Sequence, residues 1–264
     1  MLPPSPVAPL PAELSGPSAA PGPGITTVLF DLDDTLFDHM GTARAALATT
    51  AAAQPALLGA DVEALYSHYS ELLEELHAQL MVGRYTYEEA RQLRFERLLA
   101  PYGVGAAEAG RIAEQHYGHY QHLRQPLPGA VALLQALRPR YRIGIVTNNR
   151  LAEQEEKLRH LGLRDLVDAL VTSEEVGVPK PDPRIFAVAL ERLGAQPAET
   201  LLVGDNWQAD VVGALAVGIR PLWLNRTGAA RLLPHVEELT SLEPLAEVFQ
   251  RITTPVSRVL LAPD

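Results

Sequence analysis

Cysteine is absent from the 264 residues of this chain. Its absence excludes disulfide bonds, thiol nucleophiles, and zinc or iron–sulfur sites built on thiolates. A chain without disulfides fits a reducing compartment. We therefore expect a cytoplasmic protein.

Long apolar runs and early positive charges are also missing. No uninterrupted stretch approaches the roughly 18 apolar residues that a membrane-spanning helix needs, and the first positive side chain is Arg44. Secretory and mitochondrial leaders carry positive charge near their start. The sequence therefore predicts neither a leader nor a membrane as partner.

Positive charge is scarce throughout, with 22 lysines and arginines against 32 acids and a net charge of −10. Because nucleic acids are bound through their phosphates by basic surface, this balance argues against a nucleic-acid polymer as partner. The apolar fraction of 47% and the charged fraction of 20% are ordinary for a globular protein. The length suggests one or two domains.

Short apolar segments alternate with helical patterns over most of the chain. The segments that we expect to be strands, each bounded by Gly, Pro or polar residues, are 26–30, 142–146, 169–172, 200–203 and 221–224. Continuous apolar runs are typical of parallel strands covered on both faces. The helical patterns between them are 129–137, 151–161 and 182–193. This alternation predicts an α/β fold with a doubly wound, mainly parallel sheet.

One long stretch interrupts the alternation and contains no convincing strand. Its helical patterns are 43–53, 62–81, 86–99 and 106–123. Thr86 and Glu89 have the spacing of a capping box at one helix start. The expected organisation is therefore a disordered Pro/Ala-rich tail at 1–24, an α/β catalytic core at 25–39 and 125–252, an inserted four-helix cap at 40–124, and a C-terminal tail at 253–264.

Three acids in four residues follow the first expected strand, in the run Phe30-Asp31-Leu32-Asp33-Asp34-Thr35-Leu36. Crowded carboxylates repel one another unless a cation or donor groups offset their charge. Ligands of open α/β sheets bind at the carboxyl ends of the strands. A capped turn would explain one aspartate but not the whole set, so we interpret Asp31 and Asp33 as functional.

Two later strands also end in polar residues. Thr147 and Asn148 follow the second expected strand, and Gly204-Asp205 follows the fourth. A helix that begins near Trp207 would place Asp210 in its first turn, where the side chain can point back toward Asp205. Polar residues at three strand ends, with carboxylates at two of them, are hard to explain as turns and indicate a binding site.

Lysine is rare, because the chain has only Lys157 and Lys180 against 20 arginines. Lys180 stands between prolines in the run Val178-Pro179-Lys180-Pro181-Asp182-Pro183. A lysine ammonium is a compact point charge, whereas the arginine guanidinium is a planar fork. We therefore interpret Lys180 as a functional residue that needs a point charge at a rigid position.

Together these residues resemble the haloacid dehalogenase-like hydrolase superfamily, in its phosphatase branch with a helical cap after the first motif. The four family motifs match in order, at Asp31 to Thr35, at Thr147-Asn148, at Lys180, and at Gly204 to Asp210. The resemblance covers about residues 25–250. It implies a phosphoric monoester hydrolase that uses Mg²⁺ and a small phosphorylated substrate, and we expect a monomer or a homodimer.

The resemblance also implies a role for each matched position. Asp31 would be the nucleophile that forms an aspartyl-phosphate, and Asp33 would protonate the leaving oxygen and then activate water. The phosphoryl group would be bound by Thr147, Asn148 and Lys180. The metal would be held by Asp31, Asp205, Asp210 and the backbone carbonyl of Asp33.

Several other activities share parts of this pattern. Dehalogenases of the family use no Mg²⁺ and lack an acid at the position of Asp33, so we set dehalogenation aside. A phosphomutase keeps the motifs and a cap, and a regulatory binding protein could retain an inactive phosphatase fold. The core stretches 126–131, 143–148 and 161–177 look like nucleotidase-type members, which hydrolyse nucleoside 5′-monophosphates. Sugar-phosphate, acylneuraminate-9-phosphate and phosphoglycolate phosphatases are the neighbouring alternatives.

Specificity in this family is set by the cap, where the sequence offers two candidate groups. The first gathers around one helix start and comprises Arg84, Tyr85, Tyr87, Arg91 and Arg94. A ring could stack on a base and an arginine could pair with an anion, but a solvated face with packing tyrosines explains any single one better. The second group is His116, His119 and His122, which we interpret as surface or core residues and not as a zinc site.

Overall fold

The computed structural model describes residues 24–254 of the chain. The tails predicted at 1–24 and 253–264 lie almost wholly outside these residues. The contacts among Cα atoms divide the chain into two compact units. Within the described residues, one unit comprises 24–37 and 126–254 and the other comprises 38–125.

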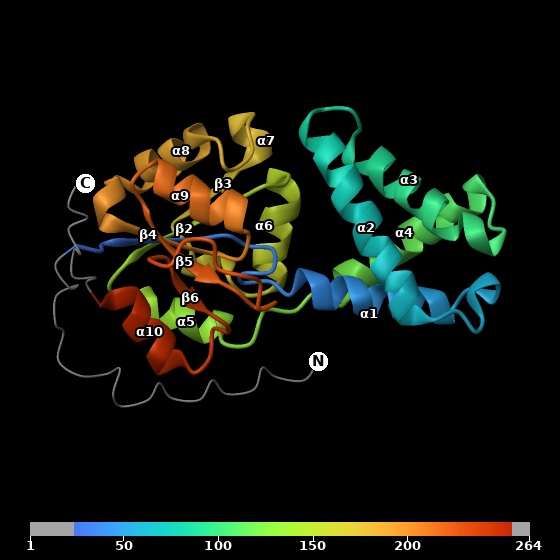
Figure 1. Cartoon of the computed structure of the whole chain (residues 1–264), viewed down its shortest axis with the longest axis horizontal. Helices are drawn as coiled ribbons and strands as arrows, with labels where there is room; N and C mark the ends of the chain where they lie inside the picture. Colours follow the sequence, from blue (N-terminus) through green and yellow to red (C-terminus); the bar gives the residue numbers. More distant parts are fainter. Residues whose placement is uncertain (1–23, 255–264) are drawn as a thin grey trace. The chain divides into compact units, whose positions relative to one another are not determined.

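A six-stranded parallel sheet forms the centre of the first unit (Figure 1). The strands, in the order β3-β2-β1-β4-β5-β6, are Ala169–Thr172, Arg142–Thr147, Thr27–Phe30, Thr200–Gly204, Arg220–Leu224 and Glu237–Leu239. Every residue of β1, β3 and β4 is buried, as a parallel strand covered on both faces requires. The predicted doubly wound α/β fold is confirmed.

The sequence patterns missed one strand, β6. Its residues Glu237, Glu238 and Leu239 pair in parallel with β5 at the edge of the sheet. An edge strand has a neighbour on one side only, and two of its three side chains are half-buried glutamates. A continuous apolar run is therefore not needed there, and the sequence of β6 contains none.

Helices cover both faces of this sheet, with α5 and α10 on one face and α8 and α9 on the other (Figure 1). The α-helices of this unit are α5 (Ala130–Leu137), α6 (Leu151–His160), α7 (Ser173–Val176), α8 (Pro183–Leu193), α9 (Gly213–Ala216) and α10 (Leu245–Thr253). A π-helical turn, Trp207–Val212, precedes α9. The buried core between α8 and the sheet includes Leu29, Val146, Ile185, Phe186 and Leu202.

The second unit is built of four helices. They are α1 (His39–Ala52), α2 (Val62–Met81), α3 (Tyr87–Leu99) and α4 (Ala106–His122). Thr86 and Glu89 form the predicted capping box, since each side chain accepts a hydrogen bond from the other residue's backbone N–H, at 3.1 and 2.8 Å. The helices bury their own core, which includes Leu76, Phe95 and Ile112.

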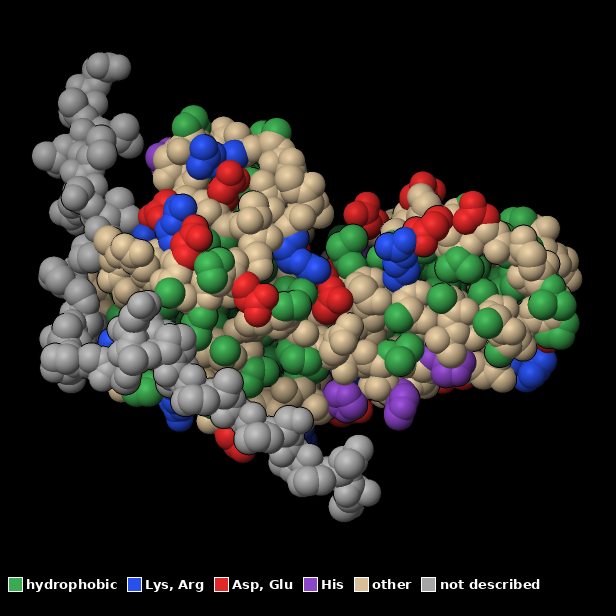
Figure 2. All heavy atoms as spheres, turned by 90° about the horizontal axis from the view of Figure 1, so that it is seen from below, with side chains coloured by type: hydrophobic (Ala, Val, Ile, Leu, Met, Phe, Trp, Pro, Cys, Tyr) green, Lys and Arg blue, Asp and Glu red, His purple; other side chains and the backbone are tan. Residues whose placement is uncertain are grey.

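The surface drawn in Figure 2 carries acids and bases interspersed, with no broad field of basic side chains on that face. Among residues 24–254, none of the helices combines the length and the apolar character that crossing a bilayer requires.

Candidate active site

Asp31 is the first residue after β1. Its backbone N–H donates to the carbonyl oxygen of Val203 at 3.0 Å, which continues the pairing of β1 with β4. The side chain is buried at the carboxyl end of a strand that is itself fully buried. The apolar run of β1 therefore delivers a carboxylate to the edge of the sheet where ligands of α/β proteins bind.

A tight turn follows Asp31 and carries Asp33. The N–H of Leu36 donates to the carbonyl oxygen of Leu32 at 2.9 Å, and both leucine side chains are fully buried under the turn. Asp34 adopts a left-handed conformation with φ of 60°, which aspartate tolerates better than most residues. The turn is thus anchored by its apolar residues and presents its acids.

Lys180 connects two of the predicted acids. Its Nζ lies 2.6 Å from Asp31 Oδ1 and 2.7 Å from Asp210 Oδ1, and the residue is only 5% exposed. Burial disfavours the ammonium, but the carboxylates of Asp210 and Asp31 outweigh it and raise the pKa of Lys180. The two carboxylates therefore favour the charged form of Lys180 inside the acidic cluster.

Asn148 holds the backbone of Lys180. Its Oδ1 accepts from the backbone N–H of Lys180 at 2.7 Å, and its Nδ2 donates to the carbonyl oxygen of the same residue at 3.1 Å. The amide side chain that follows β2 thus fixes the position of the lysine. The prediction that Asn148 binds a phosphoryl group stays a prediction, and the structure shows its side chain engaged with Lys180.

The carboxylates of Asp31, Asp205 and Asp210 form one cluster, in which one oxygen of each lies within 4.8 Å of the others. Burial raises the pKa of Asp31 to about 7, against the opposing effect of Lys180. Burial, followed by the charges of Asp31 and Asp210, raises the pKa of Asp205 to about 8. One lysine therefore does not compensate three crowded acids, and the cluster favours a further cation.

Local contacts orient the outer members of this cluster. Thr35 Oγ1 donates to Asp205 Oδ1 at 3.1 Å, and the indole N–H of Trp223 donates to the carbonyl oxygen of Asp205 at 2.7 Å. Asp210 lies on the π-helical turn, and its Oδ2 accepts from the backbone N–H of Asn206 at 3.0 Å. The structure thus places a carboxylate oxygen of Asp210 within 4.8 Å of one of Asp205.

The donor set of this cluster fits Mg²⁺. All the side-chain ligands on offer are carboxylate oxygens, which a hard divalent cation prefers. Burial, with the neighbouring acids, raises the pKa values of Asp31 and Asp205, so a cation bound there would favour their charged forms. The fourth predicted ligand, Asp33, would take part through its backbone carbonyl, and its side chain contacts other residues.

A family model for haloacid dehalogenase-like hydrolases matches residues 25–218. The chain belongs to this family. The matched region includes all seven of the predicted site residues, Asp31, Asp33, Thr147, Asn148, Lys180, Asp205 and Asp210.

Relatives of this hydrolase include several phosphatases. It is 37% identical over 161 residues to the pyrimidine 5′-nucleotidase YjjG of Escherichia coli (strain K12), an alignment that covers 61% of this chain and 70% of that protein. It is 34% identical over 203 residues to a glyceraldehyde 3-phosphate phosphatase of Pyrococcus abyssi (strain GE5 / Orsay), covering 75% and 81% of the two chains.

Among solved structures, the hydrolase resembles the HAD-hydrolase YfnB from Bacillus subtilis, whose crystal structure was determined bound to magnesium. The two chains are 26% identical, and the superposition covers 85% of this chain and 98% of that one with a TM-score of 0.71. The architecture and the family assignment therefore agree.

The hydrolase has a second buried lysine at the site, which the sequence analysis passed over. Lys157 lies on α6, and its Nζ is 2.7 Å from Asp33 Oδ1 and 3.7 Å from Glu153 Oε1. The rarity of lysine marks Lys157 as much as Lys180, because the chain has only these two lysines against 20 arginines. Both lysines of the chain are buried and each is paired with an aspartate of the first motif.

Gln154 is a second residue that the sequence analysis missed. Its Nε2 donates to Asp33 Oδ2 at 3.1 Å and to Thr147 Oγ1 at 2.8 Å, and the residue is fully buried. It therefore connects the turn after β1 with the end of β2. Thr147, the predicted phosphate ligand, is buried at this junction.

Several candidate residues of the helical unit make contacts within that unit. Arg94 donates to the Tyr69 hydroxyl at 2.8 Å, and the guanidinium of Arg91 lies 3.6 Å from the centre of the Tyr117 ring. His116 is buried in a cluster with Tyr69 and Phe95. His119 is half-buried beside Thr50 and His122 is exposed, so the three histidines have three different environments.

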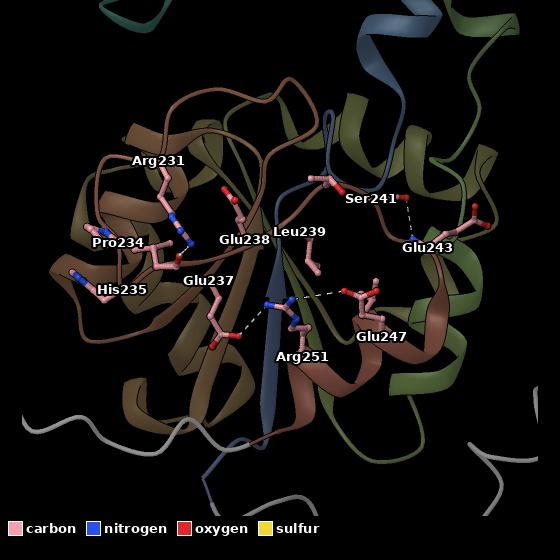
Figure 3. Close-up of a pocket in the computed structure, with 13 residues that line it drawn as sticks. Arg231, Pro234, His235, Glu237, Glu238, Leu239, Ser241, Glu243, Glu247 and Arg251 are labelled. Carbon is pink, nitrogen blue, oxygen red and sulfur yellow. Dashed lines mark hydrogen bonds and ion pairs between the residues drawn. The ribbon is translucent and has the colours of Figure 1, made fainter.

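A pocket elsewhere in the α/β unit involves none of the predicted site residues (Figure 3). It is lined by β6, the turn after it and α10, and Arg251 lies in it between Glu237 and Glu247 at 4.0 and 3.7 Å. Arg251 is thus paired with two of the acids that line the pocket. The chemistry-bearing residues therefore gather at the carboxyl ends of β1, β2 and β4 and not here.

Proposed function

We propose that this hydrolase is a Mg²⁺-dependent phosphomonoesterase that acts on a small phosphorylated metabolite through an aspartyl-phosphate on Asp31. The observation that carries the proposal is the buried ion pair of Lys180 with Asp31 and Asp210, beside the carboxylate of Asp205. A carboxylate can attack a phosphate dianion only where positive charge offsets their repulsion. The ammonium of Lys180, beside Asp31, supplies such a positive charge.

In the proposed reaction, an Asp31 carboxylate oxygen attacks phosphorus and the bond to the leaving oxygen breaks. Asp33 gives its proton to that leaving oxygen. In the second half, Asp33 takes a proton from water as the water oxygen attacks phosphorus. The bond between Asp31 and phosphorus then breaks, and Asp31 and inorganic phosphate are released.

Lys180 and Thr147 would bind the phosphoryl oxygens during both halves. Lys180 supplies a fixed charge that Asn148 positions through the backbone. Thr147 accepts a hydrogen bond from Gln154, which leaves its own hydroxyl proton for an acceptor. Phosphoryl transfer depends mainly on such positioning and charge.

The residues that would hold Mg²⁺ are Asp31, Asp205, Asp210 and the carbonyl of Asp33. When bound, the ion supplies positive charge that offsets the repulsion between the phosphate and these acids. Support for this part comes from the oxygen-only cluster and from the magnesium-bound relative YfnB.

A nucleoside 5′-monophosphate is our first candidate for the substrate. The nucleotidase YjjG supports it, whereas the glyceraldehyde 3-phosphate phosphatase supports a sugar or triose phosphate, with phosphoglycolate as a further option. A phosphomutase would require a bisphosphate activator. A regulatory binding protein would release no phosphate at all.

Inorganic phosphate release from a panel of phosphomonoesters, with p-nitrophenyl phosphate as a generic substrate, tests this proposal. We expect turnover that needs Mg²⁺, that needs no bisphosphate and that is fastest with one of the metabolites named above. No release from any phosphomonoester in the presence of Mg²⁺ would refute the proposal. Chloride release from a 2-chloro acid would instead point to dehalogenation.

A further inference from the structure

Lys157 is a lysine in the interior of the α/β unit. Its side chain is 1% exposed and its Nζ lies 2.7 Å from Asp33 Oδ1. Glu153 Oε1 lies 3.7 Å from the same nitrogen, and the centre of the Phe37 ring lies 5.1 Å from it. Removing an ammonium from water costs several kcal/mol, and apolar residues of similar volume often serve stability equally well. Stability is therefore a weak reason for a lysine at this position.

Gln154, one turn earlier on α6, holds the other oxygen of the same carboxyl group. Its two amide hydrogens are used by Asp33 Oδ2 at 3.1 Å and Thr147 Oγ1 at 2.8 Å. The opposite orientation of the amide would place its oxygen against the Asp33 carboxylate. Gln154 Oε1 finds no hydrogen-bond partner among the described residues, so the orientation favours Asp33 at the expense of a buried oxygen.

We propose that Lys157 and Gln154 are positioning residues that hold the Asp33 carboxyl group in one rotation. The inference rests on the proposed function, in which Asp33 is the group that moves the proton. Each Asp33 oxygen has a donor from α6, while the side chain keeps 26% of its surface exposed. Asn149, which precedes the helix, adds a longer contact from its Nδ2 to Asp33 Oδ2 at 3.4 Å. The carboxyl group is thus held by several donors while part of its surface stays exposed.

The two halves of the reaction explain why one rotation matters. In the first, Asp33 releases a proton to the leaving oxygen, and in the second it removes a proton from water that occupies nearly the same place. A carboxyl group that turns freely meets each partner only part of the time. Fixing both oxygens keeps one lone-pair direction aimed at that place in both halves, and positioning of this kind contributes strongly to rate.

The inference predicts a particular kinetic signature for Lys157→Met, a change that keeps the length of the side chain and removes its donor. p-Nitrophenolate leaves without needing a proton, so the first half should keep its rate, whereas the attack of water still needs Asp33. In full-length protein with saturating Mg²⁺, we expect the burst of nitrophenolate to change less than about 3-fold. We expect steady-state kcat to fall about 10-fold or more, a loss below the 10²–10⁴-fold that acid–base catalysis typically contributes. KM should fall in the same proportion, so that kcat/KM, which depends on the first half alone, stays nearly unchanged.

Two comparisons separate this role from damage to the fold. Arg164→Met removes a cation that pairs with Glu155, a residue of α6 that has no contact with Asp33 among the described interactions. This variant should leave both the burst and the steady rate unchanged. Partial unfolding would lower the burst amplitude and the steady rate in equal proportion. Should Lys157→Met fail to fold, as shown by circular dichroism, Lys157→Leu, which also removes the donor and leaves Thr147 and its hydrogen bond with Gln154 in place, is measured instead with the same expected signature.

The closing experiment is a double-mutant cycle with Asp33→Asn. If Lys157 acts through Asp33, Lys157→Met should change the steady rate less than about 2-fold once Asp33 is replaced. If the wild type hydrolyses p-nitrophenyl phosphate but the losses of the two single variants add up in the double variant, the inference alone is overturned. A slowed burst in Lys157→Met would overturn it as well. A wild type that releases no phosphate from any phosphomonoester would overturn the proposed function and, with it, this inference.

Discussion

Lys180 and Asp31 form an ion pair of 2.6 Å although 149 positions separate them in the chain. The same ammonium contacts Asp210. The Asn148 side chain accepts a hydrogen bond from the backbone N–H of Lys180 and donates one to its carbonyl oxygen. The pair therefore joins the ends of β1 and β2, the loop before α8 and the π-helical turn after β4. It is the point at which the motifs of the sequence meet.

The first prediction concerns the identity of this cation. Lys180→Arg places a longer, planar group in a fully enclosed position between two carboxylates, so its charge should be displaced. We expect turnover to fall at least ~100-fold, about 2.7 kcal/mol of transition-state stabilisation. Steady-state kinetics measures it, and Arg159→Lys, the reverse exchange at an exposed pair with Glu155, is the matched control. Wild-type turnover by Lys180→Arg would remove Lys180 from the phosphate site.

The second prediction concerns the nucleophile. Asp31→Asn preserves the shape of the side chain but removes the attacking charge, so activity should fall to near background. Circular dichroism should show an intact fold, because the amide can still accept a hydrogen bond from Lys180. A variant that turns over within about tenfold of wild type would exclude Asp31 as nucleophile, since that loss is only about 1.4 kcal/mol.

The third prediction concerns the metal and has a readout besides activity. The chain's two tryptophans, Trp207 and Trp223, have ring centres 4.7 Å apart, and Trp223 donates to the carbonyl of Asp205. Mg²⁺ added to EDTA-treated protein should change their fluorescence and raise the unfolding free energy, by about 2.7 kcal/mol at 100 times Kd. Chelation should abolish turnover and Mg²⁺ should restore it, with Mn²⁺ as a substitute.

The control for the metal is Asp205→Asn, which should show neither the fluorescence change nor the added stability. Undiminished turnover in EDTA, by protein whose metal content has been verified as negligible, would refute the metal site at Asp31, Asp205 and Asp210.

The fourth prediction concerns pH and the metal-free protein. Burial raises the pKa of Asp31 to about 7 and that of Asp205 to about 8, from 3.8. Between these limits the folded protein holds protons that the unfolded chain has released, so the free energy of unfolding falls as the pH rises. Burial lowers the pKa of His116 from 6.5 to about 3, so this residue acts in the opposite direction mainly between these two values and only slightly above pH 6.5.

The difference in urea unfolding in EDTA between pH 6.5 and pH 8 therefore reports mainly on the two aspartates. The metal-free protein should be less stable at pH 8, and Asp205→Asn should reduce the difference. Equal or greater stability of the metal-free wild type at pH 8 would show that the acids are not crowded in the way the structure places them.

The fifth prediction uses a glycine at the end of β4. A Cβ at Gly204 would collide with the carboxylate of Asp210, so Gly204→Ala should displace that side chain and lower activity well below that of wild type. Gly118→Ala in α4 is the matched control, since a Cβ there meets nothing within 4 Å. The control should keep full activity and gain about 0.5–1 kcal/mol of stability. Equal activity of the two variants would contradict the assigned position of Asp210.

The sheet and most of the site could be predicted from the sequence because each rests on a local pattern. Buried parallel strands are apolar runs, and Asp31, Thr147 and Asp205 follow such runs directly. The strand β6 escaped prediction because an edge strand with two glutamates has no such run.

Lys157 and Gln154 escaped for a different reason. The helix α6 reads Leu-Ala-Glu-Gln-Glu-Glu-Lys-Leu-Arg-His, a polar pattern typical of a solvated surface. Its two buried polar residues are explained by Asp33, which lies 124 positions from Lys157 in the chain. Only the fold brings that carboxylate to the helix, so no spacing along the sequence could show the contact.

The most direct test of the central claim is to trap the phosphoryl group during turnover. Wild-type protein is mixed with p-nitrophenyl phosphate and Mg²⁺, quenched rapidly, and its peptides are analysed by mass spectrometry. We predict that the peptide containing Asp31 gains the mass of one phosphoryl group and that Asp31→Asn shows no such gain. Phosphate release by wild type with the label on another residue, or with no labelled peptide under conditions that give a nitrophenolate burst, would contradict the account.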